Sequence, residues 1–190
     1  MILEHFSKNK RLLKTIQYTA DFIVVGGGLS GVCAAIAAAR NGLKVALIQD
    51  RPVLGGNASS EVRLWALGAT SHMGNNNRWA REGGIIDEIL VENTFRNKEG
   101  NPVIFDTVLL DKVLAEKNIS LHLNTIVTDI TKKGDKNIAS VTAYNPQNET
   151  QYIFSGTYFC DATGDGLIAY LAGAAYRVGA EDREEFDEKF

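Results

Sequence analysis

A glycine-rich turn near the N-terminus has the spacing of a nucleotide-binding loop. Gly26, Gly28 and Gly31 match the pattern G-x-G-x-x-G in the run GGGLSG. The first glycine permits a tight turn, the second lets a pyrophosphate approach the backbone, and the third lets a helix pack closely on a sheet. The start of that helix, at Leu29 and Ser30, would offer free N–H groups to the diphosphate. The alternative is a glycine-rich turn in an unrelated α/β protein.

The flanking sequence provides the strand and helix that this motif requires. Residues 21–25 (DFIVV) form a short apolar run typical of a strand buried on both faces. Residues 29–40 are alanine-rich and helical, and Asn41-Gly42 is a typical helix stop. Residues 44–48 (KVALI) predict a second buried strand. We therefore expect a parallel strand–helix–strand unit with a right-handed crossover.

The end of the second strand is where a dinucleotide-binding fold places its ribose anchor. A carboxylate is expected about 20 residues after the glycine loop. That position falls on Gln49, whose amide oxygen can accept a hydroxyl hydrogen bond, and Asp50 follows it. A one-residue offset points to the other face of a strand, so we favour Gln49 and keep Asp50 as the alternative. Arg51 is a candidate for the adenine or a phosphate, or else a solvated surface cation.

A second polar turn follows a later apolar strand, in the run CDATGDG at residues 160–166. A diphosphate would repel Asp165, so this carboxylate needs another partner, and the hydroxyls of a polyol chain suit it. Gly164 and Gly166 keep other side chains out of the way. Nicotinamide dinucleotides lack a ribityl chain and flavin dinucleotides have one. Asp165 therefore favours FAD over NAD, and the alternative is an ordinary Asp-Gly turn before a helix.

Composition narrows the class of protein. The chain has 190 residues, about the size of one ordinary domain. With 20 Lys+Arg and 23 Asp+Glu the net charge is −3, which favours neither nucleic acid nor an anionic membrane as a partner. Cys33 and Cys160 lie in apolar runs and the three histidines are far apart, so we expect no metal site.

One segment imitates an export signal, because basic residues precede the nearly uncharged stretch at 22–39. Asp21 and three consecutive glycines argue against it. The stretch has 18 residues, which is marginal for a membrane span. We expect a cytoplasmic protein, with export not excluded.

The remaining elements predict an α/β fold with a Rossmann-like, three-layer FAD/NAD(P)-binding domain, in which a β-meander or hairpin covers one face of a parallel sheet. Asp106 is a good N-cap for the second of two middle helices. The expected elements are helices at 82–95, 106–116 and 167–175, strands at 119–123, 126–130 and 158–162, and a hairpin of 138–144 with 151–154.

We divide the chain into an N-terminal arm at 1–20, a nucleotide-binding domain at 21–180 and the start of a truncated following segment at 181–190. An insertion at about 61–118 lies inside the domain.

Three runs, DFIVVGGGLSG, KVALIQDRPVLGGNASSEVR and FCDATGDG, resemble the FAD-dependent oxidoreductases of the glutathione-reductase-like superfamily. The similarity is greatest to a bacterial FAD-dependent oxidoreductase family in which Gln-Asp-Arg-Pro follows the second strand and precedes Gly-Gly-Asn. It extends from about Asp21 to about Gly179. The paired motifs are specific for the fold and for FAD, and not for a substrate. The sequence departs from many relatives at Gln49, where they have glutamate.

The resemblance implies further cofactor contacts. One loop would run beside the diphosphate and the flavin, a backbone segment would hold adenine through its N–H and C=O, and the second polar turn would hold the ribityl chain. The loop beside the diphosphate and the flavin contains Gly55, Gly56, Asn57, Ser59 and Ser60. The adenine segment is at Val127, and the ribityl turn contains Thr163, Gly164 and Asp165.

Related flavoproteins are much longer, because a second domain covers the flavin ring and supplies most substrate groups. A missing domain or a second chain would do this here. The insertion at 61–118 is expected to supply part of the substrate wall, with Arg63, His72 and Arg78 as candidates for binding an anion or moving a proton. Each of the three has a surface or structural role as its alternative.

We therefore expect an FAD-dependent oxidoreductase that moves a hydride between a small organic substrate and the flavin. The alternatives are a non-catalytic or truncated nucleotide-binding module and an NAD(P)-dependent reductase. The sequence leaves the substrate, the electron acceptor and the oligomeric state open.

Overall fold

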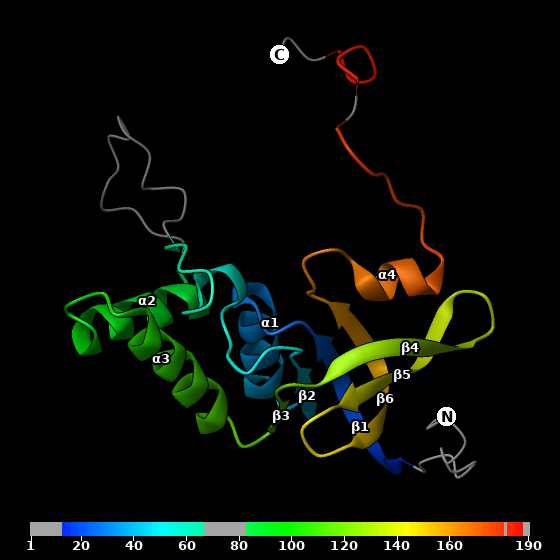
Figure 1. Ribbon diagram of the computed structural model, residues 1–190, viewed down its shortest axis with the longest axis horizontal. Coiled ribbons are helices and arrows are strands. Elements are labelled where there is room, and N and C mark those ends of the chain that lie inside the picture. Colours follow the sequence, from blue (N-terminus) through cyan, green and yellow to red (C-terminus); the bar gives the residue numbers. More distant parts are fainter. Residues whose placement is uncertain (1–12, 67–82, 181, 188–190) are drawn as a thin grey trace, which may run out of the picture.

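The computed structural model describes residues 13–66, 83–180 and 182–187, which form one mixed sheet flanked by helices (Figure 1). The sheet has six strands in the order β3-β2-β1-β6-β5-β4. The elements in chain order are β1 (Lys14–Val25), α1 (Leu29–Arg40), β2 (Val45–Ile48), the 3-10 turn η1 (Gly56–Ala58), α2 (Ile85–Arg96), α3 (Pro102–Ala115), β3 (Ile119–His122), β4 (Ile126–Lys133), β5 (Asn137–Asn145), β6 (Thr150–Asp161) and α4 (Leu167–Ala172).

The expected parallel strand–helix–strand unit is present. β1 pairs in parallel with β2 on one side and with β6 on the other. Val25 is paired with both Ile48 and Asp161, so the three strands end at the same level. The loops that follow them therefore begin side by side at one edge of the sheet, where ligands bind in open α/β folds.

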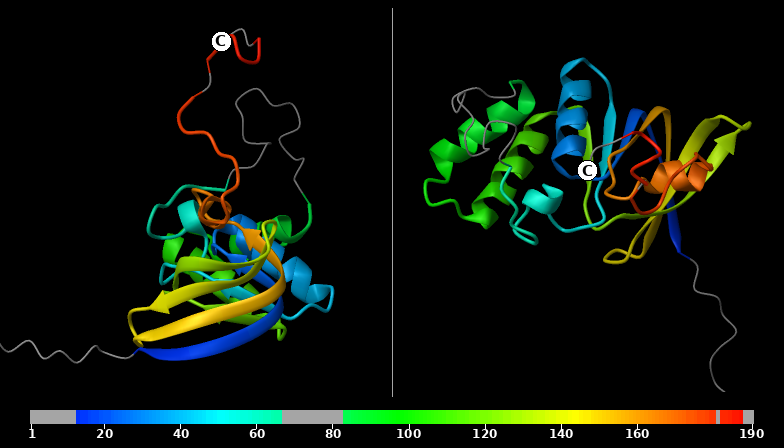
Figure 2. Two further views of the ribbon diagram at one scale, coloured as in Figure 1. Left: turned by 90° about the vertical axis from the view of Figure 1, so that its right-hand side faces the viewer. Right: turned by 90° about the horizontal axis from the view of Figure 1, so that it is seen from above.

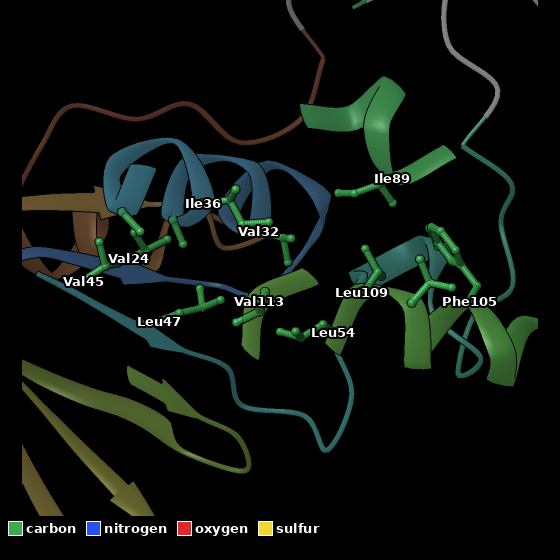
Figure 3. Close-up of a cluster of buried hydrophobic side chains, with 14 residues drawn as sticks. Val24, Val32, Ile36, Val45, Leu47, Leu54, Ile89, Phe105, Leu109 and Val113 are labelled. Carbon is green, nitrogen blue, oxygen red and sulfur yellow. The ribbon is translucent and has the colours of Figure 1, made fainter. Parts of the chain in front are cut away.

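Three layers are also present, as expected. Val24 and Leu47 point toward α1 and α3, whereas Ile23 and Ile48 point to the opposite face, because neighbouring side chains on a strand alternate. On the helical face the buried partners include Val32, Ile36, Leu109 and Val113 (Figure 3). On the other face they are Val127, Val141, Ala143 and Phe154 of the antiparallel β4–β5–β6 meander, with Ile168 of α4.

Two strands are longer than the sequence predicts. Residues 14–20, expected to belong to an arm, form the first part of β1 and pair with Thr150–Gly156. The two strands expected at 151–154 and 158–162 are one continuous strand, β6. Figure 2 shows β1 and β6 curving together from the meander into the parallel sheet. Residues 1–12 of the expected arm lie outside the described residues.

The start of α3 corrects a prediction. The helix begins at Pro102, and the side chain of Asn101 accepts a hydrogen bond from Val103 N at 2.9 Å. Asparagine at the N-cap followed by proline is a favourable helix start, because the ring pre-sets the helical φ and needs no N–H acceptor. Asp106 is therefore not an N-cap but lies inside the helix, where it is buried.

Candidate functional site

A cleft of about 1510 Å³ opens where β1, β2 and β6 end. Pockets for drug-sized ligands occupy roughly 300–1,000 Å³, so this cleft has room for a larger, extended molecule. Gly28, from the first glycine loop, and Asp165, from the turn after β6, both line it. The expectation that two distant segments of the chain meet in one crevice is confirmed.

The first glycine loop has the steric properties that its spacing predicts. Gly26 has a φ of +102°, and a Cβ there would lie 2.3 Å from Ala162 O. A Cβ on Gly31 would lie 1.9 Å from Gly26 O. A Cβ on Gly28, in contrast, would have no atom within 4 Å, because this residue faces the cleft. Gly26 and Gly31 thus shape the loop, and Gly28 leaves space for a ligand.

The amino end of α1 points at the same space. Leu29 and Ser30 line the cleft, with Gly28 as the N-cap residue. The N–H groups of a first helical turn have no acceptor within the helix. No side chain of the described residues caps this end, and its first turn holds no acid. The unsatisfied N–H groups and the helix dipole favour an anion such as a diphosphate here.

A second glycine-containing loop lies directly against the first. Gly55 N donates a hydrogen bond to Gly27 O at 2.8 Å, and Gly55 forms a parallel bridge with Gly28. A Cβ on Gly56 would approach Gly28 Cα to 3.2 Å. Gly55, Gly56 and Asn57 all line the cleft. Both loops therefore present bare backbone to one ligand position, which fits a diphosphate.

Three residues of the second loop do not line the cleft. Ser59 is buried and its Oγ accepts a hydrogen bond from Glu61 N at 3.3 Å. Ser60 N donates to Asp106 Oδ1 at 2.9 Å. Arg63 is exposed, and its Nε donates to Ser60 O at 3.0 Å. These residues shape the loop, and His72 and Arg78 lie outside the described residues.

Gln49 uses its side chain within the protein. It is only 5% exposed; its Oε1 accepts a hydrogen bond from Gly27 N at 2.7 Å, and its Nε2 donates to Val53 O at 3.2 Å. This amide therefore joins the first glycine loop to the segment that precedes the second. Asp50, the alternative ribose residue, is exposed on the cleft lining. The pairing of Gln49 with Gly27 is a tertiary contact that its place at the end of β2 does not predict.

Arg51 also lines the cleft, but it is paired with Glu61. Its Nε and Nη2 donate to Glu61 Oε2 and Oε1, both at 2.8 Å. These hydrogen bonds lower the pKa of Glu61 and raise the pKa of Arg51. Because the pair is exposed, it adds little to stability, and an anion in the cleft can compete for the guanidinium.

The turn after β6 contains two carboxylates in different roles. Asp161 holds the turn through hydrogen bonds, and Asp165 is exposed. Asp161 Oδ1 accepts hydrogen bonds from Thr163 N at 3.1 Å and Thr163 Oγ1 at 2.6 Å, and Oδ2 accepts one from Ala169 N at 2.9 Å. Leu167 N donates to Thr163 Oγ1 at 2.9 Å. Asp165 is exposed on the cleft lining with Thr163 and Gly164, and pairs with none of the described residues.

The meander closes the cleft beside the end of β2. Thr125 N donates to Gln49 O at 2.9 Å, and Asn145 Nδ2 donates to Thr125 Oγ1 at 3.1 Å. Val127, in β4, lines the cleft with its side chain 5% exposed. The residue expected to hold adenine thus lines the same cleft as the two glycine loops.

Sequence reasoning missed the apolar rim of the cleft. Leu64 and Trp65 line one part of it, and Trp65 is 81% exposed. Tyr170 and Tyr176, on the α4 side, also line it, and their rings meet edge to face at 5.4 Å. No binding motif marks these residues; the only signal was a pair of apolar side chains directly after the second glycine loop.

The described residues of the insertion reach the cleft at one place. Of its described residues, 61–66 and 83–118, only the three at 64–66 line the cleft. Helices α2 and α3 pack against each other and against α1, on the side away from α4 (Figures 1 and 2).

The described residues hold neither a metal-binding cluster nor a membrane-spanning helix. Within the described parts of the chain, no group of three or more His, Cys, Asp or Glu side chains could hold a metal ion. No helix in residues 13–66, 83–180 or 182–187 is long and apolar enough to cross a membrane.

Comparison with known proteins yields one family and several relatives. The family described as FAD dependent oxidoreductase matches residues 21–190. Fumarate reductase (cytochrome) from Shewanella frigidimarina is 32% identical over 130 residues, which are 67% of this chain and 21% of that protein. The chain thus spans about a fifth of the length of the curated relatives it matches.

Solved structures show the same fold at low identity. A geranylgeranyl bacteriochlorophyll reductase-like protein from Thermoplasma acidophilum has a TM-score of 0.57 at 18% identity, over 86% of this chain and 44% of that one. The FrdA chain of E. coli quinol fumarate reductase has a TM-score of 0.52 at 18% identity, over 80% of this chain and 33% of that one. With the family match over nearly the whole sequence, the chain belongs to the FAD-dependent oxidoreductases and its cofactor is FAD.

Proposed function

We propose that this chain is the FAD-binding part of an oxidoreductase that exchanges a hydride with a small organic substrate. The observation that carries the proposal is the meeting of Gly28 and Asp165 in one cleft, with open space at Gly28 and an exposed carboxylate at Asp165. FAD, when bound, supplies the hydride chemistry, and the protein binds and orients it.

The phosphate-binding role falls to the two glycine loops. The N–H groups at the start of α1, around Leu29 and Ser30, would donate to the diphosphate, and Gly28 and Gly55 would allow its close approach. This arrangement suits a doubly negative group because the α1 end carries no acid in its first turn.

Asp165 would accept hydrogen bonds from the ribityl hydroxyls, which are the feature that separates FAD from nicotinamide dinucleotides. Asp161 and Thr163 hold the turn that presents this carboxylate. Backbone groups of Val127, across the cleft, would hold adenine. We assign the adenosine ribose to Asp50, because Gln49 has its amide committed to the two loops.

The open rim is the proposed substrate side. Trp65, Tyr170 and Tyr176 leave large apolar surfaces exposed there, and the matched 130 residues are only 21% of the length of the matched relative. Exposed apolar patches of this kind mark interaction sites. We propose that another domain or a second chain covers the rim and supplies the substrate-binding groups.

Adding FAD to the purified chain tests the cofactor role. We expect the bound flavin to remain with the protein through gel filtration, with its visible absorption bands perturbed relative to free FAD. NADH serves as the matched competitor, because it has the diphosphate and the adenosine but no ribityl chain. Tight NADH binding without FAD binding would contradict the proposal and favour an NAD(P)-dependent reductase.

The redox role requires the full-length protein. We expect anaerobic addition of the physiological reductant or substrate to bleach the bound flavin, and air or an electron acceptor to restore it. A full-length protein that binds FAD and is never bleached by any organic donor, yet is reduced by dithionite, would be a non-catalytic nucleotide-binding module.

A further inference from the structure

A buried carboxylate in α3 has no place in the cleft. Asp106 is 8% exposed and lies on the helix face that also buries Phe105, Val108 and Leu109. A carboxylate in such surroundings is costly unless it is hydrogen-bonded. Its Oδ1 accepts a hydrogen bond from Ser60 N at 2.9 Å, and this is its one partner among the described residues.

Ser60 belongs to the loop of residues 55–66, whose front lines the cleft and whose back faces α3. Gly55, Asn57 and Trp65 are among its cleft-lining residues, whereas Ser60 is not. The loop contains little regular structure, only the 3-10 turn at Gly56–Ala58. The loop is stabilised by hydrogen bonds within itself, since Ser59 O accepts hydrogen bonds from Val62 N and Arg63 N. The front of the loop is held against the first glycine loop, because Gly55 N donates to Gly27 O, so support for its back, around Ser60, must come from elsewhere.

Helix α3 holds the loop at two points. One is Asp106 with Ser60 N. The other is apolar: a Cβ on Gly55 would lie 2.8 Å from Leu109 Cδ1, so the Leu109 side chain packs against this glycine. Asp106 and Leu109 are three residues apart and so lie on the same face of the helix. Figure 3 shows Leu109 and Phe105 in the core cluster with Leu54, which precedes the loop.

Helix α3 is a firm support for this contact. Val108, Leu109 and Val113 are fully buried between α3 and the sheet. On its solvent side, Lys112 pairs with Glu88 and Glu92 of α2. The helix is thus fixed from both sides and supports the back of the loop, whose front is held by the first glycine loop.

We propose that Asp106 is a positioning residue, which fixes the cleft wall formed by residues 55–66 through its hydrogen bond to Ser60 N and so acts on FAD binding without touching the cofactor. The part of this proposal that concerns FAD binding rests on the proposed function. It also gives the insertion a role: its helices support the cofactor loop from behind.

Amide hydrogen exchange of the 190-residue chain tests the contact without any cofactor. In Asp106→Ala we expect exchange across residues 58–64 to accelerate by at least about tenfold, while β1, β2 and α1 keep their wild-type protection. Asp106→Asn keeps an acceptor oxygen at the same place and is expected to restore protection to within about threefold. Asp111→Asn is the control, because Asp111 lies on the same helix but is exposed and pairs with Arg96.

Flavin titration tests the consequence. We expect Asp106→Ala to weaken FAD binding by about tenfold or more, with Asp106→Asn and Asp111→Asn close to wild type. Equal exchange at residues 58–64 in wild type and Asp106→Ala would overturn the positioning role. Wild-type FAD affinity in an Asp106→Ala protein with a loosened loop would overturn the link to the cofactor.

If the wild-type chain does not bind FAD, both the proposed function and the proposed effect of Asp106 on FAD binding are contradicted. The exchange experiment still decides whether Asp106 holds the loop. If Asp106→Ala does not fold, Asp106→Leu, which has the same branched arrangement of heavy atoms and lacks the acceptor, replaces it. A folded Asp106→Leu with wild-type exchange at residues 58–64 contradicts the inference.

Discussion

At the residue scale, the glycines of the first loop divide into two kinds. Gly26 and Gly31 are required by the fold, because a side chain at either position would overlap backbone atoms at 2.3 Å and 1.9 Å. Gly28 is different, since it has φ −65° and open space where its Cβ would be. Its lack of a side chain leaves the cleft open and is not required by the fold. This difference allows binding and folding to be separated by mutation.

We predict that Gly28→Val abolishes FAD binding and leaves the free energy of unfolding within about 1 kcal/mol of wild type, since the new side chain enters the cleft. Gly31→Val is the matched variant, and we expect it to prevent folding because the Gly26 backbone cannot move away. Urea unfolding followed by circular dichroism and flavin titration measure the two effects. A Gly28→Val protein that binds FAD normally would show that the diphosphate lies elsewhere.

The exposed carboxylate of Asp165 allows a second test. We predict that Asp165→Ala weakens FAD binding by about 1.5–3 kcal/mol, the usual size of a hydrogen bond to a charged group, with no loss of stability in the cofactor-free protein. Asp135→Ala, an exposed acid in the β4–β5 turn, should leave FAD affinity unchanged. Equal FAD affinity in Asp165→Ala and wild type, by isothermal titration calorimetry, would contradict the ribityl assignment.

At the scale of elements, α1, α2 and α3 are joined on their outer side by a network of ion pairs. Glu88 of α2 lies at its centre, with Arg40 Nη1 at 2.7 Å and Lys112 Nζ at 2.8 Å. Hydrogen bonds from Arg40 and then Lys112 lower the pKa of Glu88 to about 2. The network holds α3 to α2, and α3 in turn contacts the loop of residues 55–66 through Asp106 and Leu109.

We predict that Glu88→Gln lowers the free energy of unfolding by about 1 kcal/mol at neutral pH, since partly exposed ion pairs contribute little. The folded-state pKa of Glu88 is below its unfolded value of 4.5, so its stabilisation is present above pH 4.5 and is lost as the pH falls from there through about 2. Urea unfolding of wild type and variant at several pH values measures this. A stability difference that does not shrink in acid would contradict the assignment; Glu99→Gln, in the α2–α3 turn, is the neutral control.

At the scale of the whole molecule, the parallel sheet and the meander pack through an aromatic cluster. His122 of β3 meets Tyr18, Tyr152 and Phe154, with ring centroids 5.3 Å, 5.4 Å and 4.8 Å away. Its ring also lies 3.3 Å from Ser120 Oγ. Burial lowers the pKa of His122 below its ordinary value of 6.5, so the imidazole is neutral in the folded protein at neutral pH.

The lowered pKa of His122 predicts a loss of stability in mild acid. The unfolded chain binds a proton at a higher pH than the folded protein, so the stabilisation is present above about pH 6.5 and declines as the pH falls through the folded-state pKa. We predict a larger drop in unfolding free energy between about pH 7.5 and pH 5.5 for wild type than for His122→Phe. An equal drop in both proteins would show that other groups cause the acid sensitivity.

The sequence by itself predicted the unit from residues 21 to 48 and the second polar turn. These depend on local properties: apolar runs, an alanine-rich helix and glycines at positions where a Cβ would overlap backbone. It did not predict that β1 starts at Lys14, because that half of the strand is largely exposed and is stabilised only by pairing with β6. It placed Asp106 at a helix start, because local patterns do not show which of two good caps is used.

Contacts between distant segments were decided only by the tertiary structure. Side-chain type showed that Gln49 and Asp106 can form hydrogen bonds, but only the packed chain assigned them to Gly27 N and Ser60 N. The apolar rim likewise comes from two distant segments, with Trp65 on one side and Tyr170 and Tyr176 on the other, which line one cleft. The physical reason is that propensity and spacing act within a few residues, whereas a cleft depends on which strand ends meet at one edge of a sheet.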